Sequence, residues 1–317
     1  MLGTRFEELC KFRELALDWS DPEGVHSMRV ASRRLRSALR DFTPYLRKRR
    51  LTSILKLLRS LADALGEVRD QDVAIMALEK LSHQIPDEFA GTLKEYIDAR
   101  KQQRDQARAK LESRLEKEQL MELALSFRTA LALAAPTPKP NIGTGGPVAQ
   151  ISFLKMSRAI ILGRLKELEK LSPDLFKPFD VEPLHEMRIA AKRLRYAIEL
   201  FQQCWGRSIA TFARRTARLQ TALGDVHDCD VWIESFGKEI NSARKQKQTD
   251  KVDAFVWLLS HFVKLRTKHL RQAFRLWNRW EAQDTSNKLR AVLLLEKRRR
   301  QRDEKGSDPT GSSDSSK

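Results

Sequence analysis

Residues 25–42, VHSMRVASRRLRSALRDF, recur as residues 184–201, LHEMRIAAKRLRYAIELF, at an offset of 159. A second pair of blocks follows in the same order: residues 61–73, LADALGEVRDQDV, match residues 219–231, LQTALGDVHDCDV, at an offset of 158. Two matched pairs with nearly one offset indicate an internal duplication, and the period is too long for a small solenoid repeat. The sequence therefore predicts two related halves.

The composition favours helices throughout. The 317 residues include only 13 Gly and 11 Pro, and Leu, Ala, Arg, Lys and Glu are abundant, which predicts an all-α fold and argues against all-β and α/β folds. In the first half we expect helices near residues 4–18, 23–43, 47–82 and 87–133. In the second half we expect them near residues 149–171, 182–204, 207–246 and 249–282. Each half is thus predicted to form a four-helix bundle.

The expected boundaries follow from shifts in composition. Residues 136–147 concentrate proline and glycine, so we expect a linker there between a first bundle half, residues 1–135, and a second, residues 148–285. A basic C-terminal helix is expected over residues 286–302. Residues 303–317 contain no apolar side chain, and we expect disorder there.

Both copies of the repeated helix carry a basic stripe opposite an apolar face. On a helical wheel, His26 and the four arginines that follow it fall within about 80° of one another. The second copy has cations in the same registers, except that Glu199 replaces the last one. The members of the two stripes are His26, Arg29, Arg33, Arg36 and Arg40, and His185, Arg188, Lys192 and Arg195. Like charges at these spacings repel, so an unmixed, duplicated stripe indicates an anion-binding surface rather than an ordinary solvated face.

Positive charge is concentrated around these helices. Residues 26–50 carry nine Lys/Arg and one acidic residue, and residues 185–218 carry eight and two, so together they supply +14 of the formal +18. Weaker matches at similar offsets add further candidates on neighbouring helices, namely Arg49, Lys56, Arg104, Arg108, Arg207, Arg214, Lys264 and Lys268. We expect these basic faces to line a positive groove or channel.

The repeated acidic motifs have two interpretations. Asp70 and Asp72, like Asp228 and Asp230, lie two residues apart, and on a helix such a pair faces different directions, which disfavours a metal site. We favour structural roles: helix capping after the preceding glycine, or ion pairs that hold basic side chains in place. The sequence predicts no catalytic residue and no metal ligand, and we expect a non-enzyme.

Other features of the sequence indicate the cellular compartment and the kind of partner. Three cysteines lie far apart in sequence, which favours a reducing compartment over a disulfide framework. The first residues lack the pattern of a secretory signal, and no apolar run approaches the length of a membrane span. We therefore expect a cytoplasmic protein with a polyanionic partner and no membrane partner. Dimerisation through the tryptophan-rich or C-terminal helices stays open.

With its twin His-x-x-Arg-x-x-x-Arg/Lys-Arg-Leu-Arg helices and twin Leu-Gly-x-Val-x-Asp-x-Asp-Val blocks, the chain resembles the CHAD family, the conserved histidine α-helical domains, over roughly residues 4–282. The resemblance implies two pseudo-symmetric four-helix bundles around a basic central channel that binds inorganic polyphosphate. We expect no cofactor, and association with polyphosphate granules is part of our first hypothesis. By this similarity the family's histidines are His26 and His185, and the cations named above would line the channel. The sequence contains no β-rich segment of the CYTH type, so the resemblance is to stand-alone members.

The alternative is a nucleic-acid-binding helical protein, because a pI near 10 and basic helices also suit DNA or RNA phosphates. No helix-turn-helix, RNA-recognition or zinc motif supports it. A phosphate-transfer enzyme is a third and weaker hypothesis, since the sequence shows neither a glycine-rich phosphate loop nor an acidic metal cluster.

Overall fold

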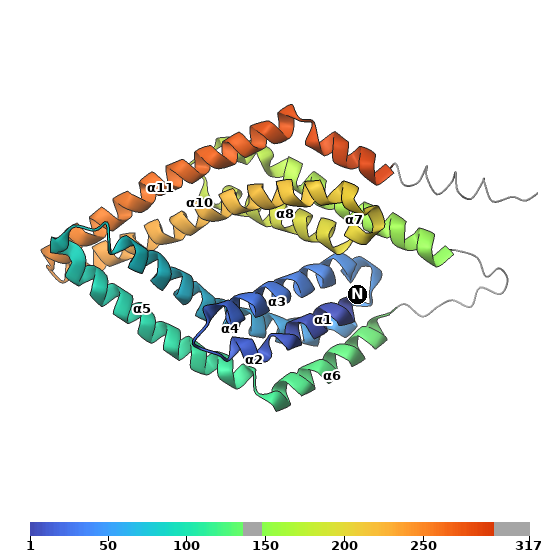
Figure 1. Ribbon diagram of the computed structural model, residues 1–317, viewed down its shortest axis with the longest axis horizontal. Helices are drawn as coiled ribbons and strands as arrows, with labels where there is room; N and C mark the ends of the chain where they lie inside the picture. The colour runs from blue at the N-terminus through green and yellow to red at the C-terminus, as the bar shows by residue number, and fades with distance from the viewer. Residues whose placement is uncertain (136–147, 295–317) are drawn as a thin grey trace, which may run out of the picture. The chain divides into compact units, whose positions relative to one another are not determined.

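The computed structural model describes residues 1–135 and 148–294, with side chains in the second stretch from residue 153 onward. All the regular elements of these residues are helices (Figure 1), so the predicted all-α class is confirmed. The chain forms two compact units. Unit 1 contains the described residues 1–135 and 229–265, and unit 2 contains residues 148–228 and 266–294.

The helices follow the predicted order closely. The first stretch holds α1 (Leu2–Lys11), α2 (Arg13–Ala16), α3 (Pro22–Phe42), the 3-10 helix η1 (Thr43–Tyr45), α4 (Lys48–Leu81), α5 (Asp87–Arg114) and α6 (Lys117–Ala134). The second holds α7 (Val148–Leu171), the 3-10 helix η2 (Ser172–Phe176), α8 (Val181–Leu200), α9 (Gln202–Trp205), α10 (Arg207–Lys245) and α11 (Thr249–Ala282). A further helix begins at residue 285 and is described to residue 294. The rest of the expected basic helix, the expected linker 136–147 and the expected tail 303–317 lie outside the described residues.

Three expected helices are divided. The expected helix 4–18 forms α1 and α2, the expected helix 182–204 forms α8 and α9, and the longest division lies between α5 and α6. The prediction of a single helix over residues 87–133 is wrong, because α5 ends before Leu115 and α6 begins after Glu116. Leu115 is fully buried, and its carbonyl accepts a 2.6 Å hydrogen bond from Nε of Arg13. Glu116 has an extended backbone, with φ −51° and ψ 141°. Neither glycine nor proline marks this break, so the local sequence gives no signal for it.

The repeated helix α3 is built as its pattern predicts. Asp21 accepts the backbone N–H of Glu23 at 2.9 Å, and proline fills the first helical position, an arrangement that stabilises the start of a helix. Its apolar side is buried, with Met28 and Leu35 fully covered. In Figure 1, α3 lies along α1 and α4, and these helices share one apolar core with α5 and α6.

Unit 1 has a second core that joins distant parts of the sequence. Leu78 of α4 and Tyr96 of α5 are buried with Phe236 of α10 and Phe255 of α11. The rings of Tyr96 and Phe236 lie 5.7 Å apart, and those of Tyr96 and Phe255 lie 5.6 Å apart. These contacts place residues 229–265, from the second half of the sequence, in unit 1.

Unit 2 is organised around α8. Helix α7 packs on α8, and Phe153 contacts Phe201 edge to face at 5.8 Å. Trp277 and Trp280 stack on each other at 5.9 Å and are buried, so neither offers a stacking surface for bases. Their indole N–H groups donate to Glu281 and Ser286, respectively. Both tryptophans therefore belong to the core of unit 2.

Candidate functional site

In unit 1, the basic stripe of α3 faces the repeated glycine block on α4. Arg29 Nη1 forms a 2.8 Å ion pair with Asp70. A Cβ atom added to Gly66 would lie 3.9 Å from Arg29 Nη2, so the guanidinium passes directly over this glycine. Both Gly66 and Asp70 lie inside the continuous helix α4. The capping interpretation of Asp70 is therefore wrong, and the alternative, an ion pair that positions a basic side chain, is confirmed.

His26 begins this stripe and lies among cations. Burial lowers its pKa, and the charge of Arg69 on α4 lowers it further. Arg33 and Arg29 on its own helix act in the same direction. Arg69 in turn lies 3.7 Å from Glu23 at the start of α3. The imidazole is thus held in its neutral form near neutral pH, where it can both donate and accept a hydrogen bond.

Helix α5 adds two more arginines around a buried carboxylate. Arg108 lies 3.8 Å from Asp72, which is only 4% exposed in its side chain. Burial raises the pKa of Asp72, while the charges of Arg108, Arg104 and Arg69 lower it. Burial also lowers the pKa of Arg108, as does the neighbouring charge of Arg104. Asp72 therefore pairs with Arg108 and lies within the electrostatic range of two further arginines, one on α4 and one on α5.

Unit 2 repeats the first part of this arrangement. A Cβ atom added to Gly224 on α10 would lie 3.7 Å from Arg188 Nε, as at Gly66 in unit 1. The first residue of the stripe, His185, faces His227 on α10, with 3.1 Å between their Nδ1 atoms. In unit 1 the corresponding pair is His26 and Arg69. The register that the duplication predicts is thus present in both units.

The two imidazoles of unit 2 lie in a cationic environment. Burial lowers the pKa of His227 to about 4, with Arg188, His185 and Lys192 adding to the effect. Burial, followed by the charge of Arg188, also lowers the pKa of His185. Both rings are therefore neutral at neutral pH, and one Nδ1 donates to the other.

The other predicted residues lie in varied places. Arg33 and Arg36 are half-buried on α3, whereas Arg40 is exposed, as is Lys56 on α4. The side chain of Arg195 contacts residues of its own helix, α8. Its Nε lies 3.5 Å from Glu199, and its guanidinium lies over the ring of Tyr196. Exposed cations on α10 and α11 make up the rest, namely Arg207, Arg214, Lys264 and Lys268.

Arg49 occupies a separate location. It lies near the start of α4, about 26 Å along the helix from Gly66 at 1.5 Å per residue. Here it lines a groove with α6 instead of contacting the His26 cluster.

Two residues of the clusters were missed by the sequence analysis. Arg69 and His227 occupy equivalent positions in the repeated block, and each faces the histidine that begins the stripe. The sequence carried a signal for both residues, because Arg69 and His227 each directly precede the first aspartate of the repeated block.

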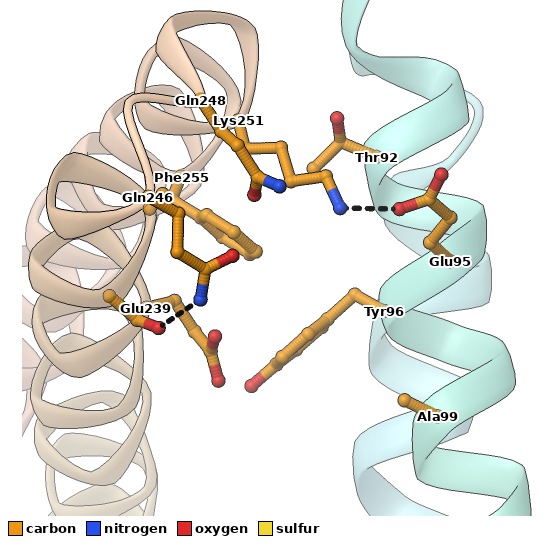
Figure 2. A pocket seen from close by; sticks show the side chains of 11 residues that line it. Thr92, Glu95, Tyr96, Ala99, Glu239, Gln246, Gln248, Lys251 and Phe255 are labelled. Carbon is orange, nitrogen blue, oxygen red and sulfur yellow. Dashed lines mark hydrogen bonds and ion pairs between the residues drawn. The ribbon is translucent and has the colours of Figure 1, made fainter.

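The cavity drawn in Figure 2 lies elsewhere in unit 1. It has a volume of about 270 Å³ between α5 and the facing ends of α10 and α11, and contains none of the predicted site residues. Lys251 and Glu95 form a 2.8 Å ion pair at one side, and the side chains of Glu239 and Tyr96 point toward each other across the space (Figure 2). Its mixed lining differs from the cationic clusters above.

Two kinds of feature are absent from the described residues. Within residues 1–135 and 148–294, no group of three or more His, Cys, Asp or Glu side chains is arranged to hold a metal ion. In the same residues, no helix is both long enough and apolar enough to span a membrane.

Comparison with known proteins identifies the family. The CHAD domain model matches residues 1–237. The chain is similar to the crystal structure of the CHAD domain from the plant Ricinus communis, with a TM-score of 0.60 and 23% identity over 92% of this chain and 89% of that one. It is also similar to PptA from Streptomyces chartreusis, with a TM-score of 0.63 and 14% identity over 87% of this chain and 96% of that one. At these identities the two structures establish the fold alone. No curated protein matches the chain. The family model covers most of the chain, including both repeated helices and both glycine blocks, and the chain therefore belongs to the CHAD domain family.

Proposed function

We propose that this chain binds inorganic polyphosphate through two basic clusters, one on each unit. Cluster A consists of His26, Arg29, Arg33, Arg69, Arg104 and Arg108, and cluster B consists of His185, Arg188, Lys192 and His227. The observation that carries the proposal is the repetition of one arrangement, an arginine of the His helix held over a glycine of the next helix. The family resemblance implies, more specifically, that such basic residues line a channel, and we include this in the proposal.

The chemistry of the clusters suits an unbranched phosphate polymer. Each guanidinium presents several N–H donors in a fixed plane, which matches the oxygens of a phosphate group. Neutral imidazoles beside them add donors without adding repulsion. Polyphosphate carries a negative charge on each phosphate and has no bases, so it requires cations at regular intervals and no base-reading groups.

We propose binding without turnover. In cluster A the carboxylates Asp70 and Asp72 pair with Arg29 and Arg108, which supports a structural role for them. Incubation of the chain with polyphosphate and Mg²⁺ should release no orthophosphate above the background. Steady release that cluster variants abolish would instead make the chain a phosphatase.

Competition tests the choice of ligand. Labelled long-chain polyphosphate, bound near physiological salt, should resist single-stranded DNA, duplex DNA and RNA except at large excess. Binding should weaken steeply with salt, because neutralised phosphates release counterions, by analogy with DNA. Equal competition by nucleic acid would favour a nucleic-acid-binding protein instead.

Substitution tests the clusters. The variant R29A/R33A/R188A/K192A should lose polyphosphate binding and keep its helical content. A matched control, R59A/K110A/K177A/K238A, removes the same charge from exposed cations that pair with acidic neighbours. Because both variants change the net charge equally, a selective loss in the first assigns binding to the clusters, and an equal loss in both would assign it to the overall charge.

A further inference from the structure

One side of α6 presents apolar side chains to solvent. Met121, Leu125 and Leu133 are 64%, 69% and 49% exposed, and their spacing of four and eight residues places them on one side of the helix. The opposite side is used for folding, since Leu120 and Phe127 are buried in unit 1. The exposed side is therefore not needed for the packing of unit 1. It also carries the exposed Glu118 and Glu122, with Lys117 and Arg128 beside them, so the formal charge of this part of α6 is balanced and the net positive charge comes from the start of α4.

A run of four exposed cations borders this apolar side. Arg47, Lys48, Arg49 and Arg50 lie at the start of α4, and the backbone N–H of Arg47 donates to the carbonyl of Ala134 at 2.9 Å. This bond joins the basic run to the end of α6.

A groove of about 490 Å³ lies at the junction. It is lined by Arg49 and Arg50 on one side and by Leu125 and Leu133 on the other. We refer to the four cations together with Met121, Leu125 and Leu133 as the α6 surface.

We propose that the α6 surface docks on an acidic phospholipid bilayer. Apolar side chains that project from one side of a surface helix insert among the lipid headgroups, and neighbouring Lys and Arg side chains bind the acidic headgroups. The α6 surface supplies both. The composition suggested no membrane partner because it offers no spanning segment, but docking at the interface requires none.

The charge of the α6 surface argues against other occupants. In a two-fold dimer centred on the basic run, the runs of the two copies would face each other and repel. An acidic protein segment would complement the charge of the basic run, but Met121 projects outward from the helix and is not part of the groove lining. A flat, deformable surface fits such projecting side chains better than a second folded protein does.

Vesicle co-sedimentation with the full chain tests the proposal. The chain should bind vesicles of phosphatidylcholine mixed with phosphatidylglycerol and not vesicles of phosphatidylcholine alone. Because the protein is basic overall, the decisive comparison holds charge constant. The variant M121S/L125S should bind acidic vesicles at least about tenfold more weakly, since it loses two inserted apolar side chains.

A matched control removes the same kind of side chain elsewhere in unit 1. M76S/V256S changes two side chains that are 54% and 41% exposed, and it should bind acidic vesicles as the unaltered chain does. Equal vesicle binding by both double variants would overturn the proposal, as would failure of the unaltered chain to bind acidic vesicles. A dimer in solution that M121S/L125S converts to a monomer would assign the α6 surface to a second copy. Polyphosphate affinity, measured in parallel, should be the same in both variants, which separates this result from any test of clusters A and B.

Discussion

At the scale of single residues, His227 stands where the other half of the chain has Arg69. Burial lowers its pKa from an ordinary value of 6.5 to about 4, so the folded chain binds this proton less tightly than the unfolded chain does. Protonation of the unfolded chain then lowers the free energy of unfolding as the pH falls from 6.5 toward 4. The variant H227Q cannot titrate, and it should lose less stability than the unaltered chain between pH 7 and pH 5.

Urea unfolding at several pH values measures this effect. If H227Q and the unaltered chain lose stability in parallel, the ring of His227 is not kept neutral by folding.

The residues of the site show what sequence could and could not predict. The stripe on α3 and its copy on α8 were predictable, because helical spacing alone decides which side chains share a face. That Arg69 faces His26, and His227 faces His185, depends on the register between two packed helices. Local spacing does not determine that register, so the sequence alone does not show which residue of the block faces the histidine.

At the scale of elements, the break between α5 and α6 depends on a tertiary contact. Arg13, whose side chain is 15% exposed, donates from Nε to the carbonyl of Leu115 at 2.6 Å. A carbonyl at a helix end that loses a charged donor is costly when it is buried, so R13A should lower the free energy of unfolding by about 1 to 3 kcal/mol. Urea unfolding checks this.

The exposed Arg59 supplies the control at the same scale. Its side chain is 75% exposed, and R59A should change stability by less than about 0.5 kcal/mol. Similar losses in R13A and R59A would mean that the bond to Leu115 does not stabilise the break. The same contact explains why sequence predicted one helix over residues 87–133: residues 13 and 115 lie far apart in the chain, and no glycine or proline marks the end of α5.

At the scale of the whole molecule, the compact units differ from the halves that the duplication defines. Residues 229–265 belong to unit 1 because Phe236 and Phe255 complete a core with Leu78 and Tyr96. The duplication records how the two halves of the sequence are related, whereas the units record which residues pack together. Helices α10 and α11 each run from one unit into the other, so a boundary drawn in sequence between the halves does not separate the two cores.

The division into compact units predicts which segments a core substitution destabilises. Phe236 is fully buried, and F236A should cost about 3 to 5 kcal/mol through the cavity that it leaves. Its largest effect on hydrogen exchange should appear in the parts of α4 and α5 around Leu78 and Tyr96, more than 100 residues away in sequence, because those segments share its core. The equally buried Phe201 is the matched control, and F201A should act mainly on α7 and α8, where it contacts Phe153. If F236A instead raises exchange only within residues 148–294, then the halves of the sequence, and not the compact units, are the cooperative parts of this protein.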